Sequence, residues 1–133
     1  MRRTDQGYTL VEILLVLALI GILSAIAIPS YWGAKSNAKY AGDAKANASV
    51  IMMALEGYRA EHGLFPPGGP FKWVQGAPPT PNPLPTVSFK SGTTLDFTLT
   101  VANDQLSYVL EATDPGNSNK SIYKVDQTGQ LLP

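Results

Sequence analysis

The chain has 133 residues, with 10 acidic and 10 basic side chains, one histidine and no cysteine. This length suits one ordinary domain, and the zero formal charge gives no support to a nucleic-acid-binding module. The missing cysteines exclude disulfides, iron–sulfur clusters and thiolate zinc sites, and the single histidine, His62, leaves little for metal binding or acid–base catalysis.

An apolar segment opens the chain: residues 8–28 contain a single charge, Glu12. At 1.5 Å per residue a helix over this segment spans roughly 30 Å, the thickness of the hydrocarbon core of a bilayer. A buried core helix would show a polar stripe, and a secretory signal peptide would have a shorter apolar core before a cleavage site such as residues 24–27. We therefore predict a membrane-spanning helix, and Arg2 and Arg3 in front of it favour a cytoplasmic N-terminus.

The segment begins with the run Gly7–Glu12 (GYTLVE) and ends at Ala27–Pro29. With the short basic stretch before it, this pattern resembles the prepilin-type N-terminus of type IV pilins and pseudopilins. That family has a leader ending in Gly, an aromatic residue after it, a Glu four positions later and a long apolar helix that contains a Gly and a Pro, here Gly21 and Pro29. Tyr8 stands where Phe is commoner. The resemblance is specific for about a quarter of the chain.

The resemblance implies a processing step and an assembly role. A prepilin peptidase would remove a leader of residues 1–7 by cutting between Gly7 and Tyr8, and the same enzyme family would methylate the new amino group of Tyr8. Glu12 would pair with the charged amino terminus of a neighbouring subunit, because an unpaired charge in a low-dielectric bundle is costly. The alternative is that the Glu12 carboxylate only reaches the membrane surface. Residues 8–30 would then serve both as the membrane anchor and as the polymerisation helix.

The same helix contains two weak points. Gly21 is a poor helix former, and Pro29 lacks a donor and crowds the carbonyl of Ala25. In a bilayer only the chain itself satisfies backbone polar groups, so the segment should stay helical with a bend near Pro29. The resemblance implies that the backbone from Gly21 to Pro29 loses regular helix in a filament. An isolated subunit should instead have a nearly continuous helix from Tyr8 to about Glu61.

Residues 31–133 are expected to form the globular domain, beginning with the second half of the helix. Apolar positions at spacings of three and four predict a helix face packed on its own domain: Ala34, Ala38, Ala41, Ala44, Ala48, Ile51, Leu55 and Tyr58. Lys35, Asp43, Asn47 and Arg59 are predicted on the other faces. Gly63, followed by Pro66 and Pro67, should end the helix.

The rest of the domain is predicted to be a loop followed by an antiparallel sheet. Residues 65–85 hold 8 of the 11 prolines, which predicts an extended loop that packs Phe71 and Trp73 on the domain. Alternating apolar residues in the sheet region 86–133 predict the following strands and turns: strands Leu95–Val101 and Leu106–Ala112, joined by a turn at Ala102–Asp104; a strand over about Ser121–Asp126, closed by Thr128 and Gly129; and an edge strand at Thr86–Lys90. The fold class is α+β, and the resemblance implies the pilin fold, with a long N-terminal helix packed on a small antiparallel sheet.

The chain shows no nucleophile–base–acid set and no glycine-rich phosphate loop, so we expect neither an enzyme nor a cofactor. Asp114–Lys120 offers three oxygen ligands, but a plain turn suits it better than a calcium site, and no metal site is expected. The leading interpretation is a structural subunit, the major pilin, of a bacterial type IV pilus. Its expected partners are other copies bound through the N-terminal helix, the prepilin peptidase, the inner-membrane assembly machinery and the membrane itself. The subunit pool would lie in the inner membrane and the filament outside the cell.

Three alternatives remain open. A pseudopilin of a type II secretion system would usually carry an acidic calcium site in its C-terminal loops, which is thin here, whereas a major pilin often closes that region with a disulfide, which is absent. A minor pilin is the second alternative, although Glu12 argues against the tip-type subunits that lack this residue. The third is a monomeric membrane protein with a C-terminal binding domain. Whether a pilus of this chain would serve motility, adhesion or DNA uptake does not follow from the sequence.

Overall fold

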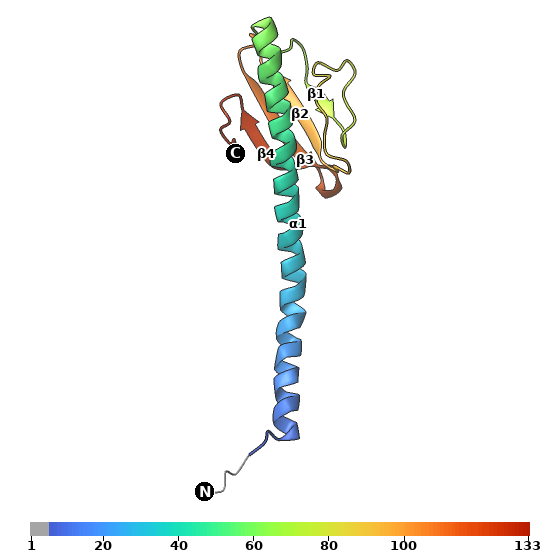
Figure 1. The fold of residues 1–133 in the computed structure, drawn as a ribbon, viewed down its shortest axis with the longest axis vertical. Coiled ribbons are helices and arrows are strands. Elements are labelled where there is room, and N and C mark those ends of the chain that lie inside the picture. Colours follow the sequence, from blue (N-terminus) through green and yellow to red (C-terminus); the bar gives the residue numbers. More distant parts are fainter. Residues whose placement is uncertain (1–5) are drawn as a thin grey trace. The chain divides into compact units, whose positions relative to one another are not determined.

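The computed structural model describes residues 6–133, so most of the expected leader, residues 1–5, lies outside the described part. One helix precedes four strands along the chain (Figure 1): α1 (Leu10–His62), β1 (Phe71–Trp73), β2 (Asp96–Val101), β3 (Tyr108–Asp114), the short 3₁₀ helix η1 (Pro115–Asn117) and β4 (Lys120–Asp126). The chain divides into two compact units, residues 1–37 and residues 38–133, and the boundary falls within α1.

Helix α1 confirms the expected continuous helix. It begins at Leu10 rather than Tyr8, because Thr9 takes the capping position, and it continues without interruption through Gly21 and Pro29. At its end Gly63 adopts a left-handed conformation, with φ of +82°, and its N–H donates to the carbonyl of Arg59 at 2.7 Å. Glycine is favoured there because it adopts positive φ without the steric penalty of a Cβ atom, so the predicted C-cap is also confirmed.

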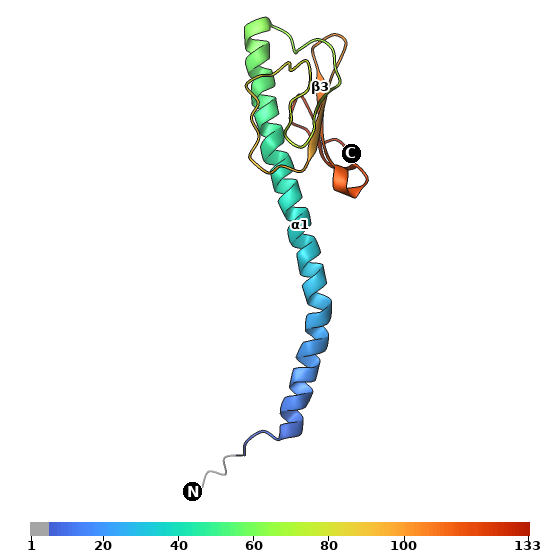
Figure 2. The ribbon, with the colours of Figure 1, turned by 90° about the vertical axis from the view of Figure 1, so that its right-hand side faces the viewer.

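The second unit contains an antiparallel sheet in the order β1-β2-β3-β4. Residues 38–62 of α1 lie across one face of this sheet (Figures 1 and 2). The register places Phe97 opposite both Trp73 and Ala112, so apolar side chains from three strands meet on the face that carries the core. This arrangement confirms the α+β fold class.

Half of the predicted helix face is buried. Ala44, Ala48, Ile51 and Leu55 are fully buried against the sheet, whereas the earlier alanines of the pattern, Ala34, Ala38 and Ala41, are exposed. The regular spacing therefore extends about three turns beyond the first position of the pattern that the sheet buries, Ala44.

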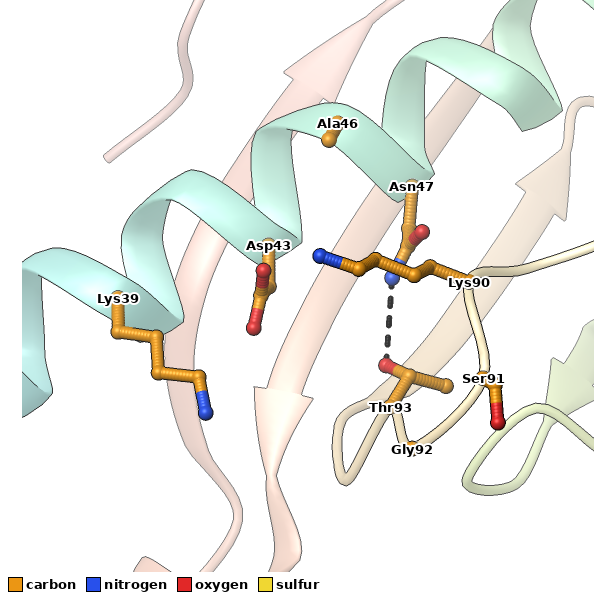
Figure 3. A pocket seen from close by; sticks show the side chains of 8 residues that line it. All are labelled: Lys39, Asp43, Ala46, Asn47, Lys90, Ser91, Gly92 and Thr93. Carbon is orange, nitrogen blue, oxygen red and sulfur yellow. Dashed lines mark hydrogen bonds between the residues drawn. The ribbon is translucent and has the colours of Figure 1, made fainter.

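Asn47 corrects the prediction that it lies on another face of the helix. Its side chain is only 5% exposed, and its Nδ2 donates to the Thr93 hydroxyl at 3.2 Å (Figure 3). Asn47 follows Ala44 by three residues and precedes Ile51 by four, which places all three on one face. The polar side chain is tolerated there because the loop before β2 supplies a hydrogen-bond partner.

The prediction that the proline-rich segment, residues 65–85, is only a loop is wrong. It contains β1, which pairs with β2 and takes the edge of the sheet, while Thr86–Lys90 forms no strand. β1 is free of proline, and an edge strand tolerates prolines beside it. The pairing is reinforced by an ion pair of 3.1 Å between Lys72 Nζ and the nearly buried carboxylate of Asp96. Phe71 and Trp73 are buried in the core, as predicted.

The three later strands are confirmed, with one correction at the start of β3. Leu106 was predicted to be a strand residue but lies in the turn and is 57% exposed. The turn is longer than expected: Ala102 N–H donates to the carbonyl of Ser107, and the Asp104 carboxylate accepts from Leu106 N–H at 3.1 Å. The turn at Thr128 and Gly129 closes β4 as predicted, with the Gly129 N–H donating to the carbonyl of Asp126.

Candidate functional site

The first unit presents apolar side chains to its surroundings on every side of the helix. Among the large apolar residues of its described part, residues 6–37, the exposed fraction runs from 48% at Ile13 to 85% at Tyr8. Within the described residues α1 is the one helix that is long and apolar enough to cross a membrane. So large an apolar surface is unfavourable in water, and its burial requires lipid or other protein chains.

Glu12 lies in the first turn of α1 and forms a reciprocal pair of hydrogen bonds with Thr9. The Thr9 N–H donates to Glu12 Oε2 at 2.7 Å, and the Glu12 N–H donates to the Thr9 hydroxyl at 3.2 Å. This is a capping box, in which two unsatisfied donors at the helix start are bonded by side chains. The sequence reasoning missed it, although the signal, Thr followed three residues later by Glu, is present at positions 9–12.

The expected cleavage junction precedes the cap in an exposed, non-helical stretch. Gly7 and Tyr8 belong to no helix or strand, and both are exposed. A Cβ atom added at Gly7 would have nothing within 4 Å, so the fold itself places no demand for glycine at this position. Tyr8 and Glu12 line one shallow hollow together with Ile13, Leu15 and Val16. The structure thus brings the expected junction and the expected pairing residue into one short region.

The other two predicted site residues lie further along the helix. A Cβ atom added at Gly21 would also meet open space, so no packing within the subunit requires glycine there. Pro29 removes one helical donor, and in the next position the Ser30 hydroxyl donates to the carbonyl of Ile26 at 3.3 Å. The bend expected near Pro29 stays a prediction.

The second unit contains a small polar pocket of about 140 Å³ between the helix and the loop before β2 (Figure 3). Lys39, Asp43 and Lys90 lie at this pocket, next to the hydrogen bond between Asn47 and Thr93. Within residues 6–133 no group of three or more His, Cys, Asp or Glu side chains could hold a metal ion.

In the loop after β3, the candidate oxygen ligand Asp114 has a structural role. The Asp114 carboxylate accepts from Gly116 N–H at 3.0 Å and thereby caps η1. The plain turn that the sequence favoured is therefore a capped 3₁₀ turn.

A groove of about 480 Å³ beside the helix is lined by Met52, Met53, Glu56 and Tyr108, among others. Tyr108 is 2% exposed, and its buried hydroxyl has no hydrogen-bond partner within the described residues. Burial raises the pKa of Tyr108 to about 12, and the carboxylates of Glu56 and Asp126 add to this effect because they oppose a second negative charge.

Comparison with known proteins identifies the N-terminal segment. Residues 2–28 match the family model of the prokaryotic N-terminal methylation motif. No solved structure matches the chain.

Three relatives show the range of similar proteins. The type IV major pilin protein PilE1 of Neisseria gonorrhoeae is 33% identical over 75 residues, which cover 53% of this chain and 32% of that pilin. The type II secretion system core protein G of Pseudomonas aeruginosa is 32% identical over 91 residues, 68% of this chain and 63% of that protein. The type IV major pilin protein PilA of Myxococcus xanthus is 37% identical over 61 residues, 46% of this chain and 27% of that pilin.

The chain spans less than two thirds of the length of each of these relatives. The matching motif includes the Gly7–Tyr8 junction, Glu12 and most of the apolar helix. The chain carries a prepilin-type N-terminal motif and is a homologue of type IV pilins and of the type II secretion system core protein G.

Proposed function

We propose that this chain is a structural subunit of a bacterial type IV pilus, most simply its major pilin, which polymerises through the first half of α1 into an extracellular filament. The observation that carries the proposal is a helix exposed on all sides with a single charge, Glu12, near its start. Lipid can cover such a helix before assembly, and copies of the same helix can cover it in a filament. The functional divisions are a leader over residues 1–7, an anchor and polymerisation helix over 8–30 and a globular domain over 31–133.

Glu12 is the residue that would select the register between subunits. Within residues 6–133 its Oε2 atom bonds the Thr9 N–H and its Oε1 atom makes no hydrogen bond. The carboxylate can therefore keep the helix cap and still accept the charged amino terminus of another subunit. Matching the two charges is favourable because leaving either unpaired among apolar helices is costly.

Three variants separate the capping role of Glu12 from its charge. Glu12→Gln keeps an acceptor at the third position of the capping box but removes the charge, Glu12→Ala removes both, and Thr9→Ala weakens the cap while keeping the charge. Filaments sheared from cells and quantified by mass spectrometry should fall at least about ten-fold for both Glu12 variants, because a loss of about 1.4 kcal/mol of pairing free energy lowers the association constant ten-fold. They should stay near the wild-type level for Thr9→Ala.

A normal filament yield from Glu12→Gln would refute charge pairing and leave Glu12 as a helix cap only. A loss in Thr9→Ala equal to that in Glu12→Ala would have the same meaning. Retention of each variant in the membrane fraction is the control, since removing a charge from the apolar segment should leave insertion intact or improve it.

Processing is the second part of the proposal. The exposed, irregular backbone at Gly7 and Tyr8 and the absence of any packing demand for Gly7 support a junction shaped for a peptidase. Peptide mapping of assembled protein should find a methylated amino terminus on Tyr8 and no residues 1–7. An intact leader on assembled protein, or a cut near Ala27, would refute the assignment.

We also propose that the backbone between Gly21 and Pro29 loses regular helix on assembly. In the subunit this stretch is helical, and neither a packing contact at Gly21 nor a donor at Pro29 holds it there. An extended stretch would lengthen each subunit and let the filament yield under load. A high-resolution filament map with unbroken helical hydrogen bonds from Gly21 to Pro29 would refute this.

A specific observation favours a second candidate, a pseudopilin of a type II secretion system. The core protein G match covers 63% of that relative, whereas the PilE1 and PilA matches cover 32% and 27% of theirs. Shearing separates the two candidates: abundant long filaments of this chain at its natural expression level mean a pilus. Their absence, together with loss of protein secretion when the gene is deleted, means a pseudopilus.

A further inference from the structure

The aromatic residues of the first unit bracket its apolar run. Within residues 6–37 they are Tyr8 at one end and the adjacent pair Tyr31 and Trp32 at the other. Tyr31 is 64% exposed and Trp32 is 69% exposed, so neither is used to pack the subunit. Gly33 and Ala34 follow them, and the chain then turns polar at the exposed Lys35.

We propose that Tyr31, Trp32 and Lys35 form an interfacial anchor that binds the boundary between the headgroups and the acyl chains of a phospholipid bilayer, on the side away from the N-terminus. Tyr and Trp favour this boundary because each combines an apolar ring with a polar group that needs water or a headgroup. Lys35 follows Tyr31 by four residues and Trp32 by three, so the three side chains share one side of the helix. Its ammonium group can reach lipid phosphates while its stem covers apolar surface.

The anchor also fixes the depth of Glu12. The helix is continuous between Glu12 and Trp32, and 20 residues at 1.5 Å each separate the two by roughly 30 Å. This equals the thickness of the hydrocarbon core. With Trp32 at one boundary, Glu12 lies at the other, where water and headgroups can solvate its carboxylate. The anchor therefore lets the subunit carry a charge in its apolar segment at low cost until a partner arrives.

The competing occupant of this surface is another copy of the chain. Two observations favour lipid. The aromatic pair is at one end of an apolar run whose length matches a bilayer, and a cation follows it, which complements anionic headgroups. The proposal shares with the proposed function the requirement that α1 spans a membrane.

The two tryptophans of the chain make the anchor measurable. Trp73 is 1% exposed in the core of the second unit, whereas Trp32 is exposed in the first. In full-length Trp73→Phe, reconstituted in vesicles of phosphatidylcholine and phosphatidylglycerol, Trp32 is the only tryptophan. Lipids brominated near the headgroup end of the acyl chain should quench it at least about two-fold more than lipids brominated near the terminal methyl.

The opposite order of quenching would overturn the anchor. So would quenching by aqueous iodide without quenching by either lipid. Full-length Trp32→Phe, which keeps Trp73, is the matched control and should respond to neither brominated lipid. If Trp73→Phe folds poorly, the difference between wild type and Trp32→Phe gives the same signal. A wild-type chain that carbonate extracts from the vesicles would refute the proposed function; a retained chain with a water-exposed Trp32 refutes the anchor alone.

Depth-setting has its own test, because the chain contains no natural cysteine. In a Leu10→Cys background, the rate of labelling by a water-soluble maleimide reports how far the start of the helix lies from water. Replacing Tyr31 and Trp32 by Ala should change that rate about two-fold or more, because the helix is then free to slide. Exchanging the two residues, Tyr31→Trp with Trp32→Tyr, should restore it. Equal rates in all three chains would overturn the depth-setting role.

Discussion

Removing one buried hydroxyl from Tyr108 should leave the second unit at least as stable as before and change its response to alkali. In Tyr108→Phe the ring keeps its edge-to-face contact with Phe65, whose centroid lies 4.9 Å away. Only the hydroxyl is lost, and it has no hydrogen-bond partner within the described residues. An unsatisfied buried hydroxyl costs about 1–3 kcal/mol, so the variant should be neutral or stabilised by about 1 kcal/mol near pH 7.

The loss of folding stability at alkaline pH provides an independent check. The pKa of Tyr108 is raised from 10.0 to about 12, first by burial and then by the carboxylates of Glu56 and Asp126. A group with a raised pKa in the folded state contributes its full stability below the unfolded pKa and loses it as pH rises through the folded one. The wild type should therefore lose up to about 2–3 kcal/mol between about pH 10 and pH 12 that Tyr108→Phe does not lose.

The assay is a urea titration of the full chain in detergent micelles, in a Trp32→Phe background so that the fluorescence comes from the buried Trp73. Tyr31→Phe is the matched control, because it removes one exposed tyrosine hydroxyl outside this core. A Tyr108→Phe variant destabilised by more than about 1 kcal/mol at pH 7 would show that the hydroxyl is bonded. The same loss in alkali for wild type and variant would show that the phenol is not its source.

Four further changes test the rest of the structure. Leu55→Ala should lower the free energy of unfolding by about 2–5 kcal/mol in the same titration, because Leu55 is fully buried. The control Met53→Ala, at an exposed position of the same helix, should change it by less than about 0.5 kcal/mol. Similar losses in the two variants would contradict the packing of α1 on the sheet. Asn47→Ala should cost about 1 kcal/mol, and adding Thr93→Val should cost little more; additive losses would mean that the two side chains are not coupled. Gly21→Ala should stabilise the subunit helix by about 0.5–1 kcal/mol, seen by circular dichroism in micelles, yet lower filament yield; unchanged yield would argue against unwinding at this position. The Thr128 hydroxyl and the backbone N–H groups after β4 lower the pKa of Asp126, so its contribution is present above its unfolded pKa and is lost as pH falls through the folded one. Asp126→Asn should therefore show a flatter stability curve below about pH 4, and an identical curve would exclude Asp126 from the acid response.

The signals that define the candidate site are local in the chain. The Gly7–Tyr8 junction, Glu12, Gly21 and Pro29 lie on one continuous stretch of chain, and their spacing is read directly from the sequence. The capping bonds between Thr9 and Glu12 are equally local, but the sequence pattern was interpreted only as a charge that pairs with another subunit.

The predictions that the structure contradicts concern residues whose environment depends on distant segments of the chain. Asn47 was predicted on another face of the helix, but Thr93, 46 positions later in the chain, provides the hydrogen bond that permits its burial. The prolines of residues 65–85 predicted a loop, but pairing with β2 gives Phe71–Trp73 the edge of the sheet. The strand predicted at Thr86–Lys90 does not form, and β1 is the edge strand beside β2.

The sequence by itself determined the continuous helix, its C-terminal end, three of the four strands and the apolar segment that requires lipid or other chains. These features follow from periodicity, capping residues and apolar length, which act over a few neighbouring residues. Only the tertiary structure decided which turns of the helix the sheet covers, which strand forms its edge and which polar groups are buried. Those outcomes depend on contacts between segments far apart in the chain, where burial overrides the preference of any single residue.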